Sequence, residues 1–244
     1  MIVTNIPNLS TKVQRYTAFT LAEVLITLGI IGVVAAMTIP ILMANYQEKQ
    51  YLTQFKETYS MLSQAYTMSS QDNGTAQLWT SSQDAYDNMK PYLKVSKDCG
   101  YATSCGAPNV LTLNGAATHG GIRYHLVLVN GATVGFGGMS TNDWGATPIL
   151  SDNNVNNVSI SVDLNGIKPP NQFGYDFFLL ALSTKNQSPV ITGPPMWWAN
   201  ENVCKKSDAG SGGWYRGGSC STWVIKHGNM DYMHRDLNAT EWAN

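Results

Sequence analysis

The chain has 244 residues and a formal net charge of −1, and only 13% of its residues are charged, against roughly 25% in a typical soluble domain. This charge balance gives no basic footprint for nucleic acid, so we expect no nucleic-acid partner. The low charge has a local source, because no Asp, Glu, Lys or Arg occurs between Glu23 and Glu48.

The first segment, residues 1–18, is a polar leader with two positive charges near its end, Lys12 and Arg15. From Val24 to Ala44 the chain carries no charge, which is long enough for a helix that crosses a hydrocarbon layer of roughly 30 Å. Basic flanks stay in the cytoplasm, so we expect the leader inside and the following chain outside. Pro40 lacks an N–H donor and predicts a kink in this helix.

The start of the apolar segment carries a specific motif, Phe19-Thr20-Leu21-Ala22-Glu23, and the apolar run after it ends near Pro40. This segment resembles the N-terminal motif of type IV prepilins and type II secretion pseudopilins. In that family a membrane peptidase cuts just before the Phe and methylates the new amine. The resemblance therefore implies processing between Ala18 and Phe19, and Ala18 stands where the family usually has Gly.

Glu23 is the one acid inside this apolar segment. A carboxylate in lipid is costly unless it is paired or protonated. The resemblance implies a partner, the positive amine of Phe19 on an adjacent filament subunit, so that the pair sets the axial register during assembly. The alternative is that Glu23 lies at the headgroup boundary, near a helix N-terminus where negative charge is favoured.

An ordinary secretory signal peptide is the competing interpretation of the same segment. Lys12 and Arg15 would form its basic region, and Val34-Ala35-Ala36 offers a small-residue cut site before Met37. Glu23 within the apolar region and the helical pattern that continues afterwards argue against it.

Beyond Pro40 the helical pattern changes from apolar on all sides to amphipathic. Apolar residues recur at spacings of three and four, at Leu52, Phe55, Tyr59, Leu62 and Tyr66. The polar run Ser69–Gly74 predicts a helix stop. We therefore expect one helix from about Leu21 to Met68, whose second half has an apolar face that the rest of its own chain must cover.

Strand patterns follow the helix, with apolar residues alternating and Asn130-Gly131 and Asn165-Gly166 as turns. The predicted strands are 122–129, 132–136, 158–164, 176–182 and 222–226. Strands clustered after one long helix predict an α+β fold with an antiparallel sheet packed on the helix, which is the pilin architecture. The expected parts are a leader at 1–18, a transmembrane or filament-core helix half at 19–44 and a globular domain at 45–244.

Four cysteines lie in two close pairs, Cys99 with Cys105 and Cys204 with Cys220. Four cysteines allow three pairings, and the closeness of each pair favours two local loops. Given the export signal, disulfides are favoured over zinc, because the CxxC or Cys/His spacing of zinc modules is missing.

Asp163, Asn165 and Asp176 are candidates to supply oxygens to a calcium ion, as in some pseudopilins. The loop lacks the twelve-residue ligand order of an EF-hand, and Asn-Gly pairs and Asp residues also suit turns. The sequence therefore favours turn chemistry, and we expect neither a metal nor another cofactor.

Catalytic motifs are missing from the sequence. The histidines His119, His125, His227 and His234 form no HExxH pair, and no nucleophile elbow or phosphate-binding loop occurs, so we expect no enzyme. Aromatic residues crowd the C-terminal quarter, at Trp197, Trp198, Trp214, Tyr215, Trp223 and Tyr232. They favour a small core, and the alternative is a surface for a glycan or protein, in a secreted or membrane-anchored extracellular binding module.

The resemblance implies a structural subunit of a type IV pilus or a type II secretion pseudopilus. It would be a single-pass inner-membrane protein with its C-terminal domain outside the cytoplasm, and part of a filament after assembly. The implied partners are other pilin-like subunits, the prepilin peptidase, an inner-membrane assembly platform and its cytoplasmic ATPase.

Overall fold

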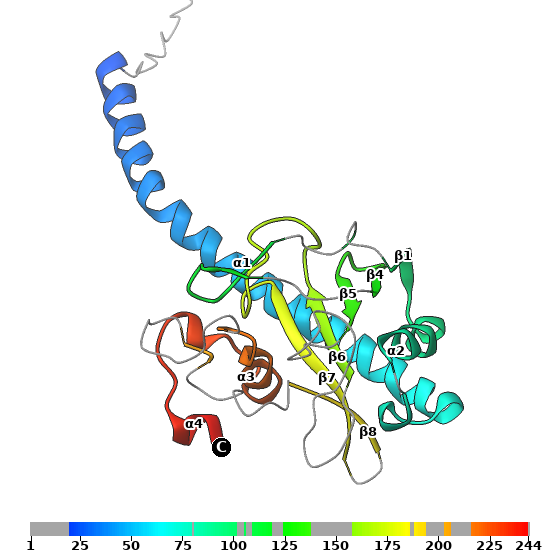
Figure 1. The fold of residues 1–244 in the computed structure, drawn as a ribbon. Coiled ribbons are helices and arrows are strands. Elements are labelled where there is room, and N and C mark those ends of the chain that lie inside the picture. Colours follow the sequence, from blue (N-terminus) through cyan, green and yellow to red (C-terminus); the bar gives the residue numbers. More distant parts are fainter. Residues whose placement is uncertain are drawn as a thin grey trace, which may run out of the picture. The chain divides into compact units, whose positions relative to one another are not determined.

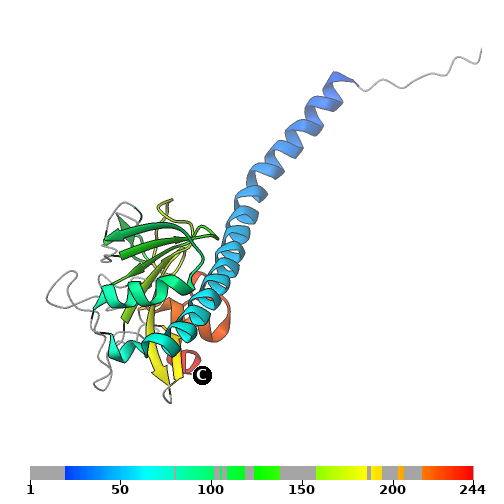
Figure 2. The ribbon, with the colours of Figure 1, turned by 90° about the vertical axis from the view of Figure 1, so that its right-hand side faces the viewer.

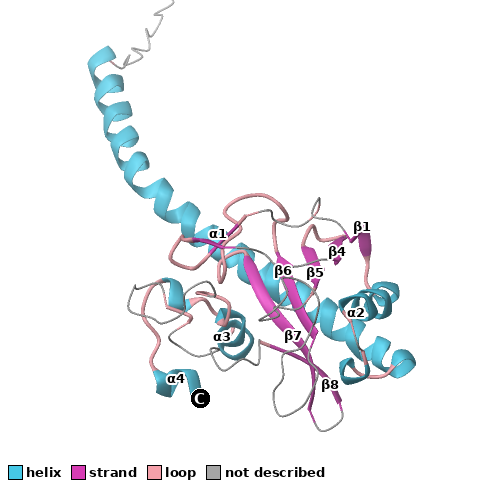
Figure 3. Cartoon of the chain, viewed as in Figure 1, coloured by secondary structure: helices cyan, strands magenta, loops and turns pink. Residues whose placement is uncertain are grey.

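The computed structural model describes residues 20–79, 81–101, 105, 109–118, 124–137, 158–185, 188–193, 203–205 and 216–243 (Figure 1). The chain forms two compact units, Met1–Tyr46 and Gln47–Asn244. One long helix and an antiparallel sheet make up an α+β fold, which confirms the predicted class (Figure 3).

Helix α1 spans Leu21–Asn73 and continues through Pro40. It ends at Gly74, whose φ of 72° is the left-handed conformation that commonly closes a helix. The helix runs further into the polar segment than the pattern predicted. The reason is that Ser69 is buried there and its hydroxyl donates to Asn88 O at 2.8 Å, so the last turn of α1 packs on its own domain.

The remaining helices are short. Their bounds are Ala76–Leu78 (η1), Ser82–Met89 (α2), Lys90–Tyr92 (η2), Cys220–His227 (α3), Asp231–Met233 (η4) and Ala239–Ala243 (α4). Helix α2 begins with a reciprocal pair of hydrogen bonds between Ser81 and Asp84, a capping box that pairs two main-chain N–H groups.

The main sheet has six strands in the order β1-β4-β5-β6-β7-β8, and every neighbouring pair is antiparallel. The strands are β1 (Val95–Tyr101), β4 (Tyr124–Leu128), β5 (Thr133–Phe136), β6 (Val158–Asp163), β7 (Phe177–Lys185) and β8 (Ser188–Thr192). A separate pair, β2 (Val110–Leu111) and β3 (Ala117–Thr118), is also antiparallel. The predicted turn at Asn130-Gly131 joins β4 to β5, and Gly131 has the positive φ, 87°, that such turns require.

The second half of α1 packs on the sheet through the predicted apolar stripe (Figure 2). Phe55, Leu62 and Tyr66 are buried, and the Phe55 ring lies 4.6 Å from the ring of Phe178 on β7. The Tyr66 hydroxyl donates to Ser183 O at 3.0 Å, so its polar end is satisfied inside the core. The stripe and the sheet therefore share one core.

The predicted strand at 222–226 is wrong, because these residues lie in α3. Cys220, Trp223 and Val224 are buried at helical spacing, and Gly228 closes the helix with a φ of 69°. A short run of apolar and β-branched residues does not distinguish a strand from a buried helix, and packing decides between them. The deciding contact is on β7, where Ser221 Oγ donates to Leu179 O.

The two outer strands of the described sheet are irregular. Strand β1 pairs with β4 through two register shifts, between Val95 and Lys97 and between Asp98 and Gly100. Strand β8 contains Pro189, which has no N–H to donate.

Replacing Phe55 by Ala should destabilise the domain by about 3–5 kcal/mol, because it removes a fully buried ring from the contact between α1 and β7. Chemical denaturation of the detergent-solubilised chain measures the change. The matched control is Met68→Ala on the same helix, whose side chain is exposed and should matter by less than about 0.5 kcal/mol. Equal effects of the two substitutions would contradict the packing of α1 on the sheet.

Candidate functional site

Glu23, the predicted assembly residue, lies in the first turn of α1. Its Oε2 accepts hydrogen bonds from the Thr20 main-chain N–H and the Thr20 hydroxyl, both at 2.9 Å. The Glu23 N–H donates to Thr20 Oγ1 at 3.2 Å. This reciprocal arrangement is a capping box, which satisfies main-chain donors that a helix start leaves without partners.

Thr20 is a helix-capping residue that the sequence analysis missed. The signal was present, because Thr20-Leu21-Ala22-Glu23 has the S/T-x-x-E pattern of a capping box. The predicted cleavage residues Ala18 and Phe19 lie outside the described residues.

The apolar half of α1 is exposed on all sides in the single chain. Leu25, Ile26 and Ile31, which point in different directions around the helix, are each more than 60% exposed. The hydroxyls of Thr27 and Thr38 donate to main-chain oxygens within the same helix, so these polar side chains need no outside partner. Among the described residues, α1 is the one helix long and apolar enough to cross a membrane.

The cysteines form two disulfides, Cys99 with Cys105 and Cys204 with Cys220. The second is completely buried and ties the segment around Cys204 to the first residue of α3. It also packs closely against the loop before β7, because a Cβ placed on Gly174 would lie 3.0 Å from Cys220 Sγ.

The loop between β6 and β7 holds Asp163, Asn165 and Asp176, the residues considered for calcium. Asp176 is fully buried, and both of its oxygens accept hydrogen bonds. Gln172 N–H donates to Oδ1 at 2.6 Å, and Asn171 N–H donates to Oδ2 at 3.0 Å. The Asn165 amide adds a third bond, to Oδ2 at 3.1 Å. Asp176 therefore holds the main chain of the loop in place.

The same loop is attached to α1. Asn165 Nδ2 lies 3.0 Å from the Tyr51 hydroxyl, and Gln54 Nε2 donates to Leu164 O. Gln54 also reaches Asn130 O in the neighbouring turn at 3.3 Å. Polar side chains of one helix face thus bind two turns of the sheet.

The two acids of this loop are buried close to each other. The pKa of Asp163 is raised to about 8, first by burial and then by the charge of Asp176, while hydrogen bonds from the main-chain N–H groups of Asn165 and Gly166 oppose the shift. Burial also raises the pKa of Asp176, against hydrogen bonds from Gln172, Asn171 and Asn165. Because the two carboxyl groups lie close together in a buried loop, ionisation of one disfavours ionisation of the other.

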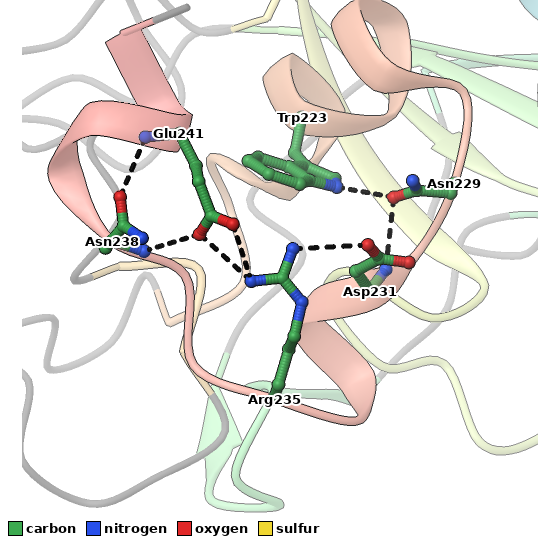
Figure 4. Close-up of polar contacts among 6 residues, drawn as sticks. All are labelled: Trp223, Asn229, Asp231, Arg235, Asn238 and Glu241. Carbon is green, nitrogen blue, oxygen red and sulfur yellow. Dashed lines mark hydrogen bonds and ion pairs between the residues drawn. The ribbon is translucent and has the colours of Figure 1, made fainter.

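The C-terminal segment is held by its own polar contacts (Figure 4). Arg235 Nη1 donates to both oxygens of Glu241 at 2.9 Å, and its Nη2 lies 3.3 Å from Asp231 Oδ2. Trp223 Nε1 donates to Asn229 Oδ1 at 2.7 Å. These bonds join α3, η4 and α4.

The aromatic residues that the structure describes in the C-terminal quarter of the chain are part of the hydrophobic core. Trp223 and Tyr232 are buried, and the Trp223 ring stacks on His227 with 3.8 Å between the ring centroids. Trp197, Trp198, Trp214 and Tyr215 lie outside the described residues. Of the histidines that the sequence analysis considered for catalysis, His234 pairs with Glu48 at 2.7 Å and His125 is buried. His119 lies outside the described residues.

Comparison with protein families adds the decisive observation at the N-terminus. Residues 14–39 match the prokaryotic N-terminal methylation motif. This match supports a type IV pilin-like protein. Residues 41–103 of the chain also match a family of unknown function (DUF6613). No curated protein and no solved structure matches the chain.

The motif supports a structural subunit. The motif and the long apolar helix fit a membrane-anchored precursor. No group of three or more His, Cys, Asp or Glu side chains suited to a metal occurs in the described part of the chain.

The buried Asp163 predicts a stability that falls as pH rises. The folded pKa of about 8 exceeds the unfolded value of 3.8, so the folded state holds the proton more tightly and is destabilised as pH rises from about 4 to about 8, by up to about 1.4 kcal/mol per pH unit. Denaturation across this range in chelator-treated buffer measures the slope. Asp163→Asn should reduce it, whereas the control Asp87→Asn, at an exposed site, should not. An unchanged slope in Asp163→Asn would contradict the assignment.

Proposed function

We propose that the chain is a structural subunit of a type IV pilus or a type II secretion pseudopilus. The prepilin peptidase removes residues 1–18 and methylates the amine of Phe19, and the mature chain stays in the inner membrane as a single span. An inner-membrane platform and its ATPase then move it into a filament of pilin-like subunits, with the globular unit outside the cytoplasm.

One observation supports this proposal most directly: a completely exposed apolar helix begins with a single carboxylate. Between Leu21 and Tyr46 the helix buries no side chain in its own chain, and a surface that is apolar on every side is stable only in lipid or among other helices. The Glu23 carboxylate is tolerated among lipid or apolar helices when its charge is paired. Filament assembly provides both the neighbouring helices and a neighbouring amine.

The capping box adds a second role for Glu23 to this mechanism. Thr20 Oγ1 and Thr20 N–H both bind Oε2, which holds the carboxylate at the start of the helix. An oriented carboxylate loses less conformational entropy when a neighbour's amine approaches than a free one does. Thr20 is therefore a positioning residue, and Glu23 is the residue that binds the neighbour.

Glu23→Gln and Thr20→Ala separate charge pairing from helix capping. Gln still fits a capping box but carries no charge, so Glu23→Gln should reduce incorporation into filaments by more than about tenfold, which corresponds to about 1.4 kcal/mol. Thr20→Ala keeps the carboxylate and loses the cap, worth about 1 kcal/mol of helix stability, and should assemble within a few-fold of the parent. Quantifying the subunit in sheared filaments measures both.

Leader removal, followed by intact mass, is the control for both variants. If Thr20→Ala were as defective as Glu23→Gln while both were processed, orientation and charge would be equally necessary. If Glu23→Gln assembled normally, the role of Glu23 would be capping alone, and charge pairing would be excluded.

The mature N-terminus provides an independent check. Sequencing or mass spectrometry of the processed chain should find N-methylated Phe19 as the first residue. Ala18→Arg should prevent cleavage and leave the precursor in the membrane, because the resemblance implies a small residue before the cut. A mature chain that begins at Met37 would instead identify a secretory signal peptide and overturn the proposal.

A further inference from the structure

Two exposed apolar side chains lie at one edge of the main sheet. Strands β4 and β6 run in the same direction, because each is antiparallel to β5, and both end at this edge. Val129 follows β4 and is 61% exposed, and Ile167 follows β6 and is 57% exposed. The two turns adjoin, since a Cβ placed on Gly166 would lie 3.8 Å from Gly131 O.

The same edge carries two exposed lysines. Lys94 precedes β1, and its main-chain oxygen accepts a hydrogen bond from the Val129 N–H at 3.0 Å. Lys168 directly follows Ile167 in the loop between β6 and β7. Neither lysine forms an ion pair with a residue that the structure describes.

The acids near this edge are buried or paired. Asp163 and Asp176 are both buried in the loop between β6 and β7. Glu48, near the start of the globular unit, pairs with His234 at 2.7 Å. The outer surface of the edge is therefore apolar and positively charged.

Helix α1 meets the sheet at this edge. Gln54 Nε2 donates to Asn130 O at 3.3 Å, and the Tyr51 hydroxyl lies 3.0 Å from Asn165 Nδ2. The globular unit begins at Gln47, so Tyr51 is only about 6 Å of helix inside it. The apolar part of α1, which is long enough to cross a membrane, comes immediately before this point.

The loop that presents Ile167 is held at both ends. The Asn165 amide donates to Asp176 Oδ2 at 3.1 Å, and the Asn171 N–H donates to the same oxygen at 3.0 Å. The tip of the loop is therefore fixed on its own domain. A surface that is already ordered loses less conformational entropy when it binds.

We propose that this edge, formed by Lys94, Val129, Ile167 and Lys168 and called here the lysine edge, docks on the anionic phospholipid surface of the membrane that α1 enters. The lysines bind the phosphates, and the apolar side chains enter the boundary of the acyl chains. The headgroup layer is about 5–8 Å thick, similar to the length of helix before α1 joins the edge. The inference rests on the membrane anchor of the proposed function and not on filament assembly.

The test uses the full chain, with one copy in each lipid nanodisc. The discs contain phosphatidylcholine alone or an equal mixture with phosphatidylglycerol. All four native cysteines are in disulfides, so a fluorophore on Val129→Cys labels a single thiol. Brominated acyl chains quench a fluorophore that touches them, so the quenching measures the ratio of docked to undocked units.

Quenching should be strong in the mixed discs and weak in phosphatidylcholine alone. It should also fall between about 0.1 M and about 1 M salt, because the screening length shortens from about 10 Å to about 3 Å.

The matched control is the same fluorophore on Leu78→Cys, which should stay unquenched. Leu78 is 72% exposed and belongs to η1, where the Ala76 N–H donates to the Tyr66 hydroxyl. Tyr66 in turn donates to Ser183 O at the other end of β7, so η1 lies at the opposite edge of the sheet.

Charge and apolar contact are tested separately on the labelled chain. Lys94→Gln and Lys168→Gln should each lower the ratio of docked to undocked units about fivefold. Lys94→Arg and Lys168→Arg keep the charge and should leave the ratio unchanged. Ile167→Ser should lower it about tenfold. These sites are exposed, so thermal unfolding in detergent should match the parent.

Three results would overturn the lysine edge. The first is a Val129 label that is quenched no more than the Leu78 label. The second is quenching that is equal in the two lipid compositions and unchanged by both Lys→Gln variants. The third is a change in fluorescence that occurs only when several copies share one disc, which would identify a second subunit as the partner.

The membrane anchor is checked in the same experiment. A chain that does not remain with the discs would overturn the anchor and the lysine edge together. A chain that remains with the discs while its Val129 label stays unquenched would overturn the lysine edge alone.

Discussion

Covering the apolar surface of α1 is the physical requirement on which the rest of the structure depends. From Leu21 to Tyr46 the helix exposes apolar side chains in every direction, so its partners must come from outside the chain. From Phe55 to Ser69 the apolar surface narrows to one face, and the chain covers it with its own sheet. Helical propensity alone does not require this division. The change from an all-round apolar pattern to a stripe decides which half faces lipid or neighbouring helices and which half belongs to a folded domain.

Polar groups have specific roles in both units. At the start of α1, Thr20 and Glu23 form reciprocal hydrogen bonds, so the carboxylate is oriented within its own chain. In the globular unit, the loop between β6 and β7 buries two acids, and one of them, Asp176, is occupied by N–H donors from its own loop. Asp163 keeps an oxygen without a donor in the described structure.

The sequence predicted the elements whose periodicity is long or whose turn chemistry is distinctive. The helical stripe at Phe55, Leu62 and Tyr66 located the core face of α1, and Asn130-Gly131 located a hairpin. Periodicity failed for residues 222–226, where a short β-branched run became α3 because a disulfide and the contact of Ser221 with β7 fix it there. Strand β1 was missed because its exposed and partly buried residues do not alternate. The hydrogen bonds from the main-chain N–H groups of Asn171 and Gln172 to Asp176 were not predictable, because only the folded loop brings these groups together.

The irregular outer strands β1 and β8 affect how copies of the globular unit would pair at high local concentration. In the proposed filament, subunits that share one helical core would hold their globular units at a very high local concentration, where any regular strand edge would offer its free N–H and C=O groups to the next copy. Pro189 removes a donor from β8, and the register shifts of β1 bend its hydrogen-bonding edge. In the proposed filament, neighbouring globular units would therefore meet through side chains rather than by extending one continuous sheet, and the outer layer would be protected from strand-to-strand aggregation.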